Sequence, residues 1–420
     1  MSDREFWLLQ GVRTPFTKVD GTLSEEGAIE ISIPVVQEMA EHIDDCPDMM
    51  VWGTVAPNLA YSNIAREIWV DSGLDPNVPS LSTVMACSTS MAAVFDAAGV
   101  LGHGGRDVAM CGGVESMSRV QIGLSQSLSD WLRRATGISS PTDALDALKD
   151  LSIGDIGLHI PSIKNRATGK SMGEHCEEMA KEWNIPRQDQ DEIALASHNN
   201  AVAAQEDGFF DDLLISYGGA DKDAFPRADT SLQALGKLSP AFDRENGTLT
   251  AGNSSPLTDG AAGVWLSTED GLERFDDDRP RVKMLDWEVA AVDIFTEGLL
   301  MAPAYAIPRI LARNDLGYDD IELWEIHEAF AAQVACHVKA LEDEGFVKDR
   351  VGVDRDFGDF PTDRINPNGG SVALGHPFGA TGGRILSQAV KELAQMESGT
   401  RAIVSICADG GLGTVALLEA

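Results

Sequence analysis

The stretch VPSLSTVMACSTSMAAVFDAAGVLGHG (residues 78–104), followed by RDVAMCGGVESM (106–117), decides the fold. Its first part is strand-like, and from Ser88 onward it is rich in Ala and Met, which favours a helix. Residues 106–117 then predict a strand that ends in a glycine turn. The sequence therefore predicts a strand–helix–strand unit, with Cys87 where the first strand passes into the helix.

The same order recurs near the end of the chain. SVALGHPFGATGGRILSQAVKELAQM (371–396) has a short apolar run, a turn and a helix, and TRAIVSICADGGLGT (400–414) has a strand that ends in a glycine turn. When the two units are aligned, Cys87 falls opposite His376, and Cys111 falls opposite Cys407. An approximate repeat of this kind predicts two similar α/β halves, although chance similarity between two such units would give the same pattern.

The size and charge of the chain limit its classes of function. With 420 residues it should form two or three domains or lobes, and its 43% hydrophobic content is enough for a large core. The formal net charge is −35, so general electrostatic binding to nucleic acid or to an anionic membrane is not expected. The acidity also fits a salt-loving source, but an ordinary acidic cytosolic protein is equally compatible with it.

The cysteines indicate a reducing compartment, and we expect a cytoplasmic protein. The six cysteines form no CxxC pair, so we expect neither a structural zinc site nor a disulfide framework. The N-terminal stretch MSDREFWLLQGVRTPF lacks the apolar core of a signal peptide. No uninterrupted apolar run approaches the length of about 18 residues that a membrane span requires.

The rest of the chain fits around the two units. Residues 5–16 and 48–55 predict strands, and residues 25–44 predict a helix. The middle region, 118–249, is polar, loop-rich and helical in pieces, especially over 175–207. A long insertion between two scaffold halves is often a lid or a binding module.

Cys87 and His376 are candidates for nucleophilic catalysis. A helix N-terminus favours a thiolate, and a thiolate attacks thioesters and ketones. His376 lies in the glycine-rich stretch GGSVALGHPFGATGG, from which it could take the proton of the thiol. Each residue taken alone has a simpler interpretation, as a buried core cysteine or as a structural histidine in a glycine turn.

Cys407 and His327 are the second pair of candidates. Cys407 precedes ADGGLG at a strand end, where a thiol could move a proton to or from carbon. His327, in WEIHEAFA at a strand–helix junction, could donate a hydrogen bond to a carbonyl oxygen. A core strand cysteine and a solvent-facing histidine at a helix start are the simpler alternatives.

Taken together, these segments resemble the thiolase family. The resemblance extends from Arg13 to Thr414 and rests on seven ordered segments: MACSTSMAA, GGVESMS, MGEHCEEMAKEWNIPRQDQDEIALASHNNAVAAQEDGFF, LSPAF with GTLTAGNSSPLTDGAA, HEAFAAQ, NPNGGSVALGHPFGATGGR and CADGGLG. It implies an α/β thiolase fold, in which two similar halves stack as an α-β-α-β-α core with an inserted loop domain. The implied domains are residues 1–117 with 250–272, the loop domain 118–249, and residues 273–420.

The resemblance also implies roles for the site residues. Cys87 would be acylated, His376 would activate it, and Cys407 would be the acid/base at the acetyl-CoA methyl group. His376, and His327 through a water, would bind the thioester oxygen of acetyl-CoA, and the backbone N–H groups of Cys87 and Asp409 would bind the acyl oxyanion. Asp409 stands where relatives have Gly or Ala, and we predict that its side chain points away, to a backbone N–H or a cation.

The ligands and partners follow from the same resemblance. CoA and acyl-CoA would lie over the loop domain and contact Met172, Arg227, Leu238 and Ser255. A charge-assisted bond from Arg227 to a phosphate is as probable as a surface arginine with no such role. Neither a metal nor an organic cofactor is expected. We expect a homodimer or homotetramer, and a complex with an enoyl-CoA hydratase/3-hydroxyacyl-CoA dehydrogenase subunit is possible.

The implied function is thiolytic cleavage of 3-ketoacyl-CoA to acetyl-CoA and a shortened acyl-CoA, which is a reversible Claisen condensation. The His of HEAF and the run IFTEGLLMAPAYAIPRILAR resemble the subgroup of trifunctional-complex β-subunits, which indicates fatty-acid β-oxidation. Alternatives are a biosynthetic acetoacetyl-CoA thiolase and a non-catalytic acyl-CoA-binding subunit. A decarboxylating ketoacyl synthase also pairs Cys with His, but it lacks a second catalytic cysteine such as Cys407.

Overall fold

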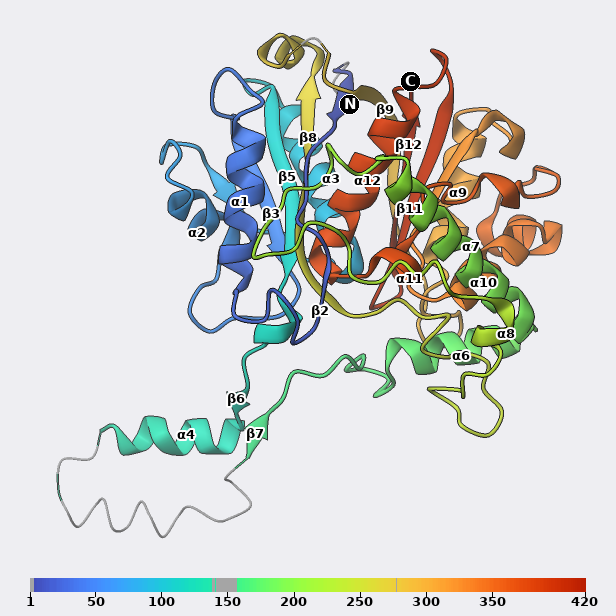
Figure 1. Cartoon of the computed structure of the whole chain (residues 1–420), viewed down its shortest axis with the longest axis horizontal. Helices are drawn as coiled ribbons and strands as arrows, with labels where there is room; N and C mark the ends of the chain where they lie inside the picture. Colours follow the sequence, from blue (N-terminus) through green and yellow to red (C-terminus); the bar gives the residue numbers. More distant parts are fainter. Residues whose placement is uncertain (1–3, 138–139, 141–156, 277) are drawn as a thin grey trace.

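The computed structural model describes residues 4–137, 140, 157–276 and 278–420. Most of the strands belong to one mixed sheet of ten strands, which both halves of the chain build together (Figure 1). The strands of this sheet are β1 (Phe6–Leu9), β2 (Thr17–Lys18), β3 (Met49–Thr54), β4 (Ser80–Leu81), β5 (Val108–Glu115), β8 (Thr258–Thr268), β9 (Arg281–Ala291), β10 (Leu323–Ile326), β11 (Arg401–Ala408) and β12 (Leu412–Glu419). The described helices are α1 (Ala28–Ala40), α2 (Ile64–Asp71), α3 (Thr89–Leu101), α4 (Gln126–Ala135), α6 (Met172–Glu182), α7 (Arg187–Glu206), α8 (Leu232–Leu235), α9 (Ala302–Arg313), α10 (Ala331–Leu341), α11 (Ser371–Leu374) and α12 (Thr381–Leu393).

The order of the strands confirms the two similar halves. The sheet runs β10-β11-β12-β9-β1-β8-β5-β3-β4, so each half repeats one pattern outward from the β9–β1 junction. In each half one strand pairs in parallel with an outer neighbour and antiparallel with an inner one, β5 in the first half and β11 in the second. The two halves are joined by antiparallel pairing of β1 with β9.

Helices α3 and α12 form the central layer between the two halves of the sheet (Figure 1). Apolar side chains from both helices pack with side chains of β5 and β11 in one buried cluster. Helices α1 and α2 cover the outer face of the first half, and α9 covers the outer face of the second. The predicted α-β-α-β-α layering is therefore present, and burial of this central cluster is the main force that joins the halves.

The repeat is real, but its predicted register is shifted by three residues. Both central helices have 13 residues and both following strands have 8, and the helices begin at Thr89 and Thr381. On this register Gly379, not His376, lies opposite Cys87. Likewise Val114, not Cys111, lies opposite Cys407. The two reactive cysteines therefore occupy non-equivalent places in the two halves.

The glycines of β5 lie inside the strand and do not form the predicted turn. Gly112 and Gly113 pair in register with Gly263 and Ala262 of β8. A Cβ atom on Gly113 would lie 2.1 Å from the carbonyl oxygen of Gly379, so only glycine permits this approach. In β11 and β12 the predicted glycine turn is present, with Gly410 and Gly411 at positive φ.

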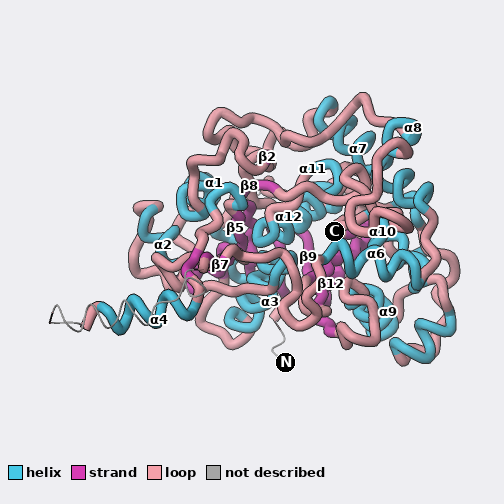
Figure 2. The backbone as a smooth tube through the Cα atoms, turned by 90° about the horizontal axis from the view of Figure 1, so that it is seen from below, coloured by secondary structure: helices cyan, strands magenta, loops and turns pink. Residues whose placement is uncertain are grey.

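The middle region leaves the sheet after β5 and returns at β8. It contains α6 and α7, which agree with the helical pieces predicted there, and a two-stranded sheet of β6 (Gly123–Leu124) and β7 (Leu158–His159). Figure 2 shows the strands enclosed by helices and loops, while α4 projects away from the body.

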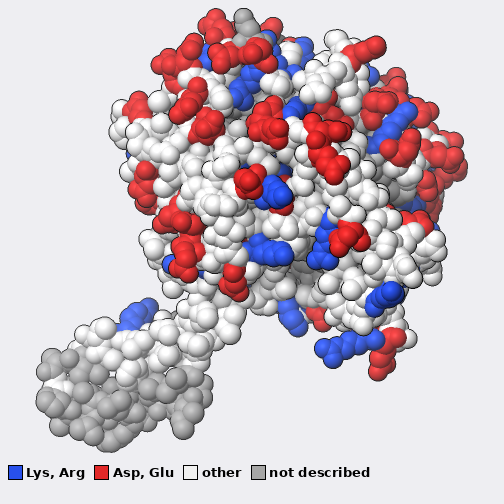
Figure 3. Space-filling model, in the orientation of Figure 1, with Lys and Arg blue, Asp and Glu red and all other residues white. Residues whose placement is uncertain are grey.

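The surface reflects the acidic composition. Asp and Glu cover much of the face drawn in Figure 3, and Lys and Arg are interspersed among them, more often in its lower half. None of the described helices is both long and apolar enough to cross a bilayer.

The close approach of β5 to Gly379 gives a stability prediction. Gly113→Ala should lower the free energy of unfolding by about 1–3 kcal/mol or more, because its methyl group meets a backbone carbonyl that cannot rotate away. The matched variant Gly99→Ala, at an exposed position in α3 with open space around it, should instead raise stability by about 0.5–1 kcal/mol. Urea denaturation of both variants measures the difference, and equal stabilities would contradict the packing described.

Candidate active site

Cys87 lies on a sharp turn at the start of α3. It is the middle residue of a single 3-10 turn, Ala86–Ser88, and Ala86 before it has a φ of +45°. Thr89 holds this turn, because its hydroxyl donates to the Ala86 carbonyl (2.8 Å) and accepts from the Met85 N–H (2.9 Å). A non-glycine residue at positive φ is strained, and such strain is found where a side chain must be presented to a site.

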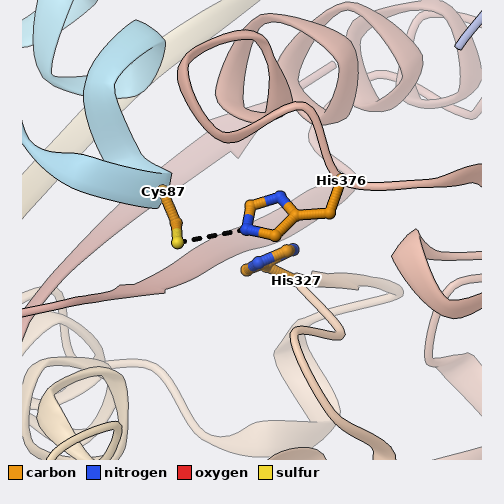
Figure 4. Close-up of side chains that lie close together, drawn as sticks. All are labelled: Cys87, His327 and His376. Carbon is orange, nitrogen blue, oxygen red and sulfur yellow. Dashed lines mark hydrogen bonds between the residues drawn. The ribbon is translucent and has the colours of Figure 1, made fainter. Parts of the chain in front are cut away.

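His376 brings its imidazole from the second half to Cys87. Its Nε2 lies 3.1 Å from Cys87 Sγ (Figure 4). Its Nδ1 lies 2.6 Å from Thr381 Oγ1. Gly375, at a φ of +104°, turns the chain just before it. The His376 backbone N–H donates to the carbonyl of Pro256, which is on the return from the middle region. The predicted Cys–His pair is therefore present, and both ring nitrogens of His376 are engaged.

The pair is uncharged at rest. Loss of hydration, with a smaller contribution from the Asp409 carboxylate, raises the pKa of Cys87 to about 12. Burial, helped by the positive charge of Arg384, lowers the pKa of His376 to about 3. The backbone N–H groups around the sulfur act to lower the pKa of the thiol, but the loss of hydration outweighs them. The thiol can still lose its proton to His376 as a bond to sulfur forms.

His327 lies beside His376 and is completely buried. It follows β10, its backbone N–H donates to Ser405, and its ring centroid is 4.3 Å from that of His376 (Figure 4). Its Nδ1 lies 2.9 Å from Ser371 Oγ, whereas its Nε2 is buried without a hydrogen-bond partner among the described residues. The alternative of a solvent-facing histidine is therefore excluded. Burial lowers its pKa well below the usual value, so the ring is neutral.

The segments that carry Cys407 and Cys87 are joined by a hydrogen bond between the residues next to them. The Ser88 hydroxyl donates to the carbonyl of Ile406 (3.2 Å), which ties the Cys87 turn to the end of β11. Cys407 is 1% exposed, and burial raises the pKa of its thiol well above the usual value, with the nearby Cys87 adding to the shift. Cys407 is therefore a packed strand cysteine, and its nearness to Cys87 is compatible with the proton-transfer role that the resemblance implies.

Asp409 contributes a backbone group and a charge near the thiol. Its N–H, like that of Cys87, stabilises negative charge on the Cys87 sulfur and acts to lower the pKa of that thiol. As predicted, its carboxylate accepts from a backbone N–H, that of Gly410 (2.6 Å). It also accepts from the Asn165 amide (2.7 Å), a neutral partner and not the cation that was the alternative.

The four candidate CoA-binding residues divide into two groups. Met172 starts α6 and packs in the cluster that contains Cys407. Ser255 donates its hydroxyl to the carbonyl of Ala329, two residues after His327. Arg227 and Leu238 are exposed on the middle region, and Arg227 is near enough to help lower the pKa of His198 in α7.

The Cys87, His327 and His376 side chains form a donor set that a metal could use. One ligand atom from each lies within 4.8 Å of the others, and thiolate with imidazole suits a soft divalent ion such as zinc.

All six cysteines are free thiols in the structure.

Several site residues were not found by sequence reasoning. Ser371 and Thr381 lie within the glycine-rich stretch that was singled out for His376 alone, and Arg384 directly follows it. Their signal was present, since they are the polar residues within an otherwise apolar and glycine-rich segment. Asn165 gave no signal, because its bond to Asp409 joins positions 244 residues apart.

Two family models and several relatives of known function match almost the whole length of the chain. The profile "Thiolase, N-terminal domain" matches residues 7–270, and "Thiolase, C-terminal domain" matches residues 278–420. A 3-ketoacyl-CoA thiolase of Photobacterium profundum is 36% identical, covering 98% of this chain and 96% of that protein. A 3-ketoacyl-CoA thiolase of Shewanella loihica is 34% identical with the same coverage.

Solved structures are similar to this chain over nearly all of its length. The acetyl-CoA acetyltransferase of Bacillus anthracis has a TM-score of 0.79 and 28% identity, covering 100% of this chain and 99% of that chain. The Acat5 thiolase of Ascaris suum, solved in complex with coenzyme A, has a TM-score of 0.79 and 25% identity, covering 99% of this chain and 100% of that chain.

The charge on Asp409 gives a prediction for the reactivity of Cys87. Asp409→Asn removes the negative charge that disfavours the thiolate but keeps the backbone N–H. The pKa of Cys87 should therefore fall, and iodoacetamide should alkylate Cys87 about threefold to tenfold faster at a fixed pH. The pH profile of alkylation, with exposed Asp71→Asn as control, measures this. A profile for Asp409→Asn that overlies the wild-type profile would contradict the account.

Proposed function

Because the chain belongs to the thiolase family, we propose that Cys87 is the nucleophile through which it transfers acyl groups. The chain is an acetyl-CoA C-acyltransferase, which cleaves 3-ketoacyl-CoA with CoA to give acetyl-CoA and a shortened acyl-CoA. The observation that carries the role of Cys87 is the 3.1 Å contact between its sulfur and His376 Nε2. This contact gives a desolvated thiol a base at hydrogen-bond distance.

The first half-reaction forms an acyl-enzyme. Cys87 Sγ attacks the 3-keto carbon as its proton passes to His376 Nε2, while Thr381 accepts the hydrogen bond from Nδ1. The bond between C2 and C3 then breaks, and its electron pair becomes the enolate of acetyl-CoA. The thiol of Cys407 protonates that enolate at carbon, so acetyl-CoA leaves and Cys407 becomes a thiolate.

The second half-reaction transfers the acyl group to CoA. The proton that His376 took from Cys87 passes to the Cys407 thiolate, which leaves the imidazole free to accept the thiol proton of the incoming CoA. The CoA sulfur attacks the acyl carbon, and Cys87 departs as a thiolate that regains its proton from His376. Two half-reactions through one covalent intermediate predict ping-pong kinetics.

The developing negative charges have two sets of donors. The backbone N–H groups of Cys87 and Asp409 would bind the acyl oxyanion, supported by their effect on the charge of the sulfur. His327 and His376 would bind the thioester oxygen of acetyl-CoA, supported by the unpartnered, buried Nε2 of His327.

We also propose where CoA binds and how the protein assembles. Residues 118–249 would form a loop domain over which CoA lies, between the halves 1–117 with 250–272 and 273–420. Met172 and Ser255, which lie beside the catalytic segments, are the better supported contacts, with Arg227 and Leu238 toward the phosphates. We propose no cofactor other than CoA as substrate, a homodimer or homotetramer in the cytoplasm, and a role in β-oxidation.

The role of Cys87 predicts a specific loss of activity. Cys87→Ala should lower kcat for thiolysis by at least about 10³-fold, because the covalent intermediate cannot form. Cys111→Ala is the matched control: Cys111 is a fully buried thiol on β5, and its loss should reduce stability by about 1 kcal/mol without changing kcat. Thiolysis of acetoacetyl-CoA and of a long-chain 3-ketoacyl-CoA is followed by the consumption of CoA, and undiminished activity of Cys87→Ala refutes the role.

A further inference from the structure

The orientation of His327 depends on one hydroxyl group. Its Nδ1 lies 2.9 Å from Ser371 Oγ, and Nε2 has no hydrogen-bond partner in the described part of the chain. A ring nitrogen of His327 lies within 4.8 Å of both the Cys87 sulfur and a ring nitrogen of His376. A neutral imidazole carries one proton, so the nitrogen that holds it determines whether the ring donates or accepts toward the site.

Ser371 has a second partner that restricts its own proton. Arg384 Nη2 lies 2.7 Å from Ser371 Oγ, and a guanidinium group can only donate. The serine oxygen therefore accepts from Arg384. Among the described residues, the remaining hydrogen-bond partner of this hydroxyl is His327 Nδ1. If Nδ1 also donated to the oxygen, the buried hydroxyl proton would have no acceptor, which is unfavourable.

Arg384 is held in place by a buried chain of polar groups. The guanidinium is 2% exposed, and its Nη1 lies 3.5 Å from Gln388 Oε1. The Gln388 amide donates in turn to the carboxylate of Glu325, at 3.1 Å. Three secondary-structure elements, β10, α11 and α12, thus contribute to a chain that ends at His327. These hydrogen bonds restrict the orientation of the Arg384 guanidinium, although its Nε is buried without a partner among the described residues.

We propose that Ser371, oriented by Arg384, is a positioning residue that keeps the proton of His327 on Nε2, where it can be donated to an oxygen of the substrate. The inference rests on the proposed function only for that last step, since the position of the proton is a property of the free protein. Neither Ser371 nor Arg384 lies in the contact between Cys87 and His376. Loss of the Ser371 hydroxyl should therefore impair the step that needs His327 and leave the reactivity of the nucleophile unchanged, whereas the charge of Arg384 also acts on the pKa of His376.

Two measurements on the complete protein test the proposal. The first is a ¹⁵N–¹H correlation spectrum of histidine-labelled wild type, in which His327→Gln identifies the signal of His327. We expect a proton on Nε2 in the wild type. The second compares Ser371→Ala with Ser405→Ala, which also removes a buried serine hydroxyl, but one that has no hydrogen-bond partner among the described residues.

Ser371→Ala should lower kcat for thiolysis about tenfold to a hundredfold, while KM and the rate of Cys87 alkylation stay at their wild-type values. Ser405→Ala should keep the wild-type kcat. A wild-type proton on Nδ1, a kcat of Ser371→Ala equal to that of Ser405→Ala, or a parallel fall in Cys87 alkylation would each overturn the proposal. A wild type without any thiolysis would refute the proposed function instead, and the spectrum would still decide where the proton lies.

Discussion

The site depends on one contact across the two halves of the chain, between the sulfur of Cys87 and Nε2 of His376. Neither half could form it alone, since the thiol comes from the turn before α3 and the imidazole from the turn before α12. Burial of the apolar faces of these two helices against each other and against the sheet brings the turns together. Gly113 and Gly379 then let β5 pack closely against the segment that follows His376.

Burial, which accompanies the contact between Cys87 and His376, also determines the charge of the two side chains. In water a thiol and an imidazole titrate near neutral pH, but here desolvation raises the pKa of the thiol and lowers that of the imidazole. The resting site is therefore a neutral pair, surrounded by buried charges of both signs such as Arg384 and Glu115. In the proposed reaction, charge develops when substrate reacts, and the backbone N–H groups and His327 would stabilise it.

Much of the fold and the catalytic constellation could be predicted from the sequence, because local patterns encode them. The strand–helix–strand units, the glycine turn after Cys407 and the candidates at 87, 327, 376 and 407 all lie in short, distinctive segments. The register of the repeat was wrong because both halves carry similar apolar runs, and only the packed helices fix the alignment. The bond from Asn165 to Asp409 could not be predicted, because it joins two ordinary polar residues 244 positions apart and its formation depends on the tertiary structure. The glycines of β5 were assigned to a turn because the close approach that requires them comes from a distant segment.

The most direct test is to trap the acyl-enzyme and locate it. The protein is incubated with an acyl-CoA in the absence of free CoA, quenched in acid, digested and mapped by mass spectrometry, for the wild type and for His376→Ala. The account predicts an acyl group on the peptide that contains Cys87 in the wild type and little or none there in His376→Ala. An acyl group on a different cysteine, or equal acylation of Cys87 in both proteins, would contradict it.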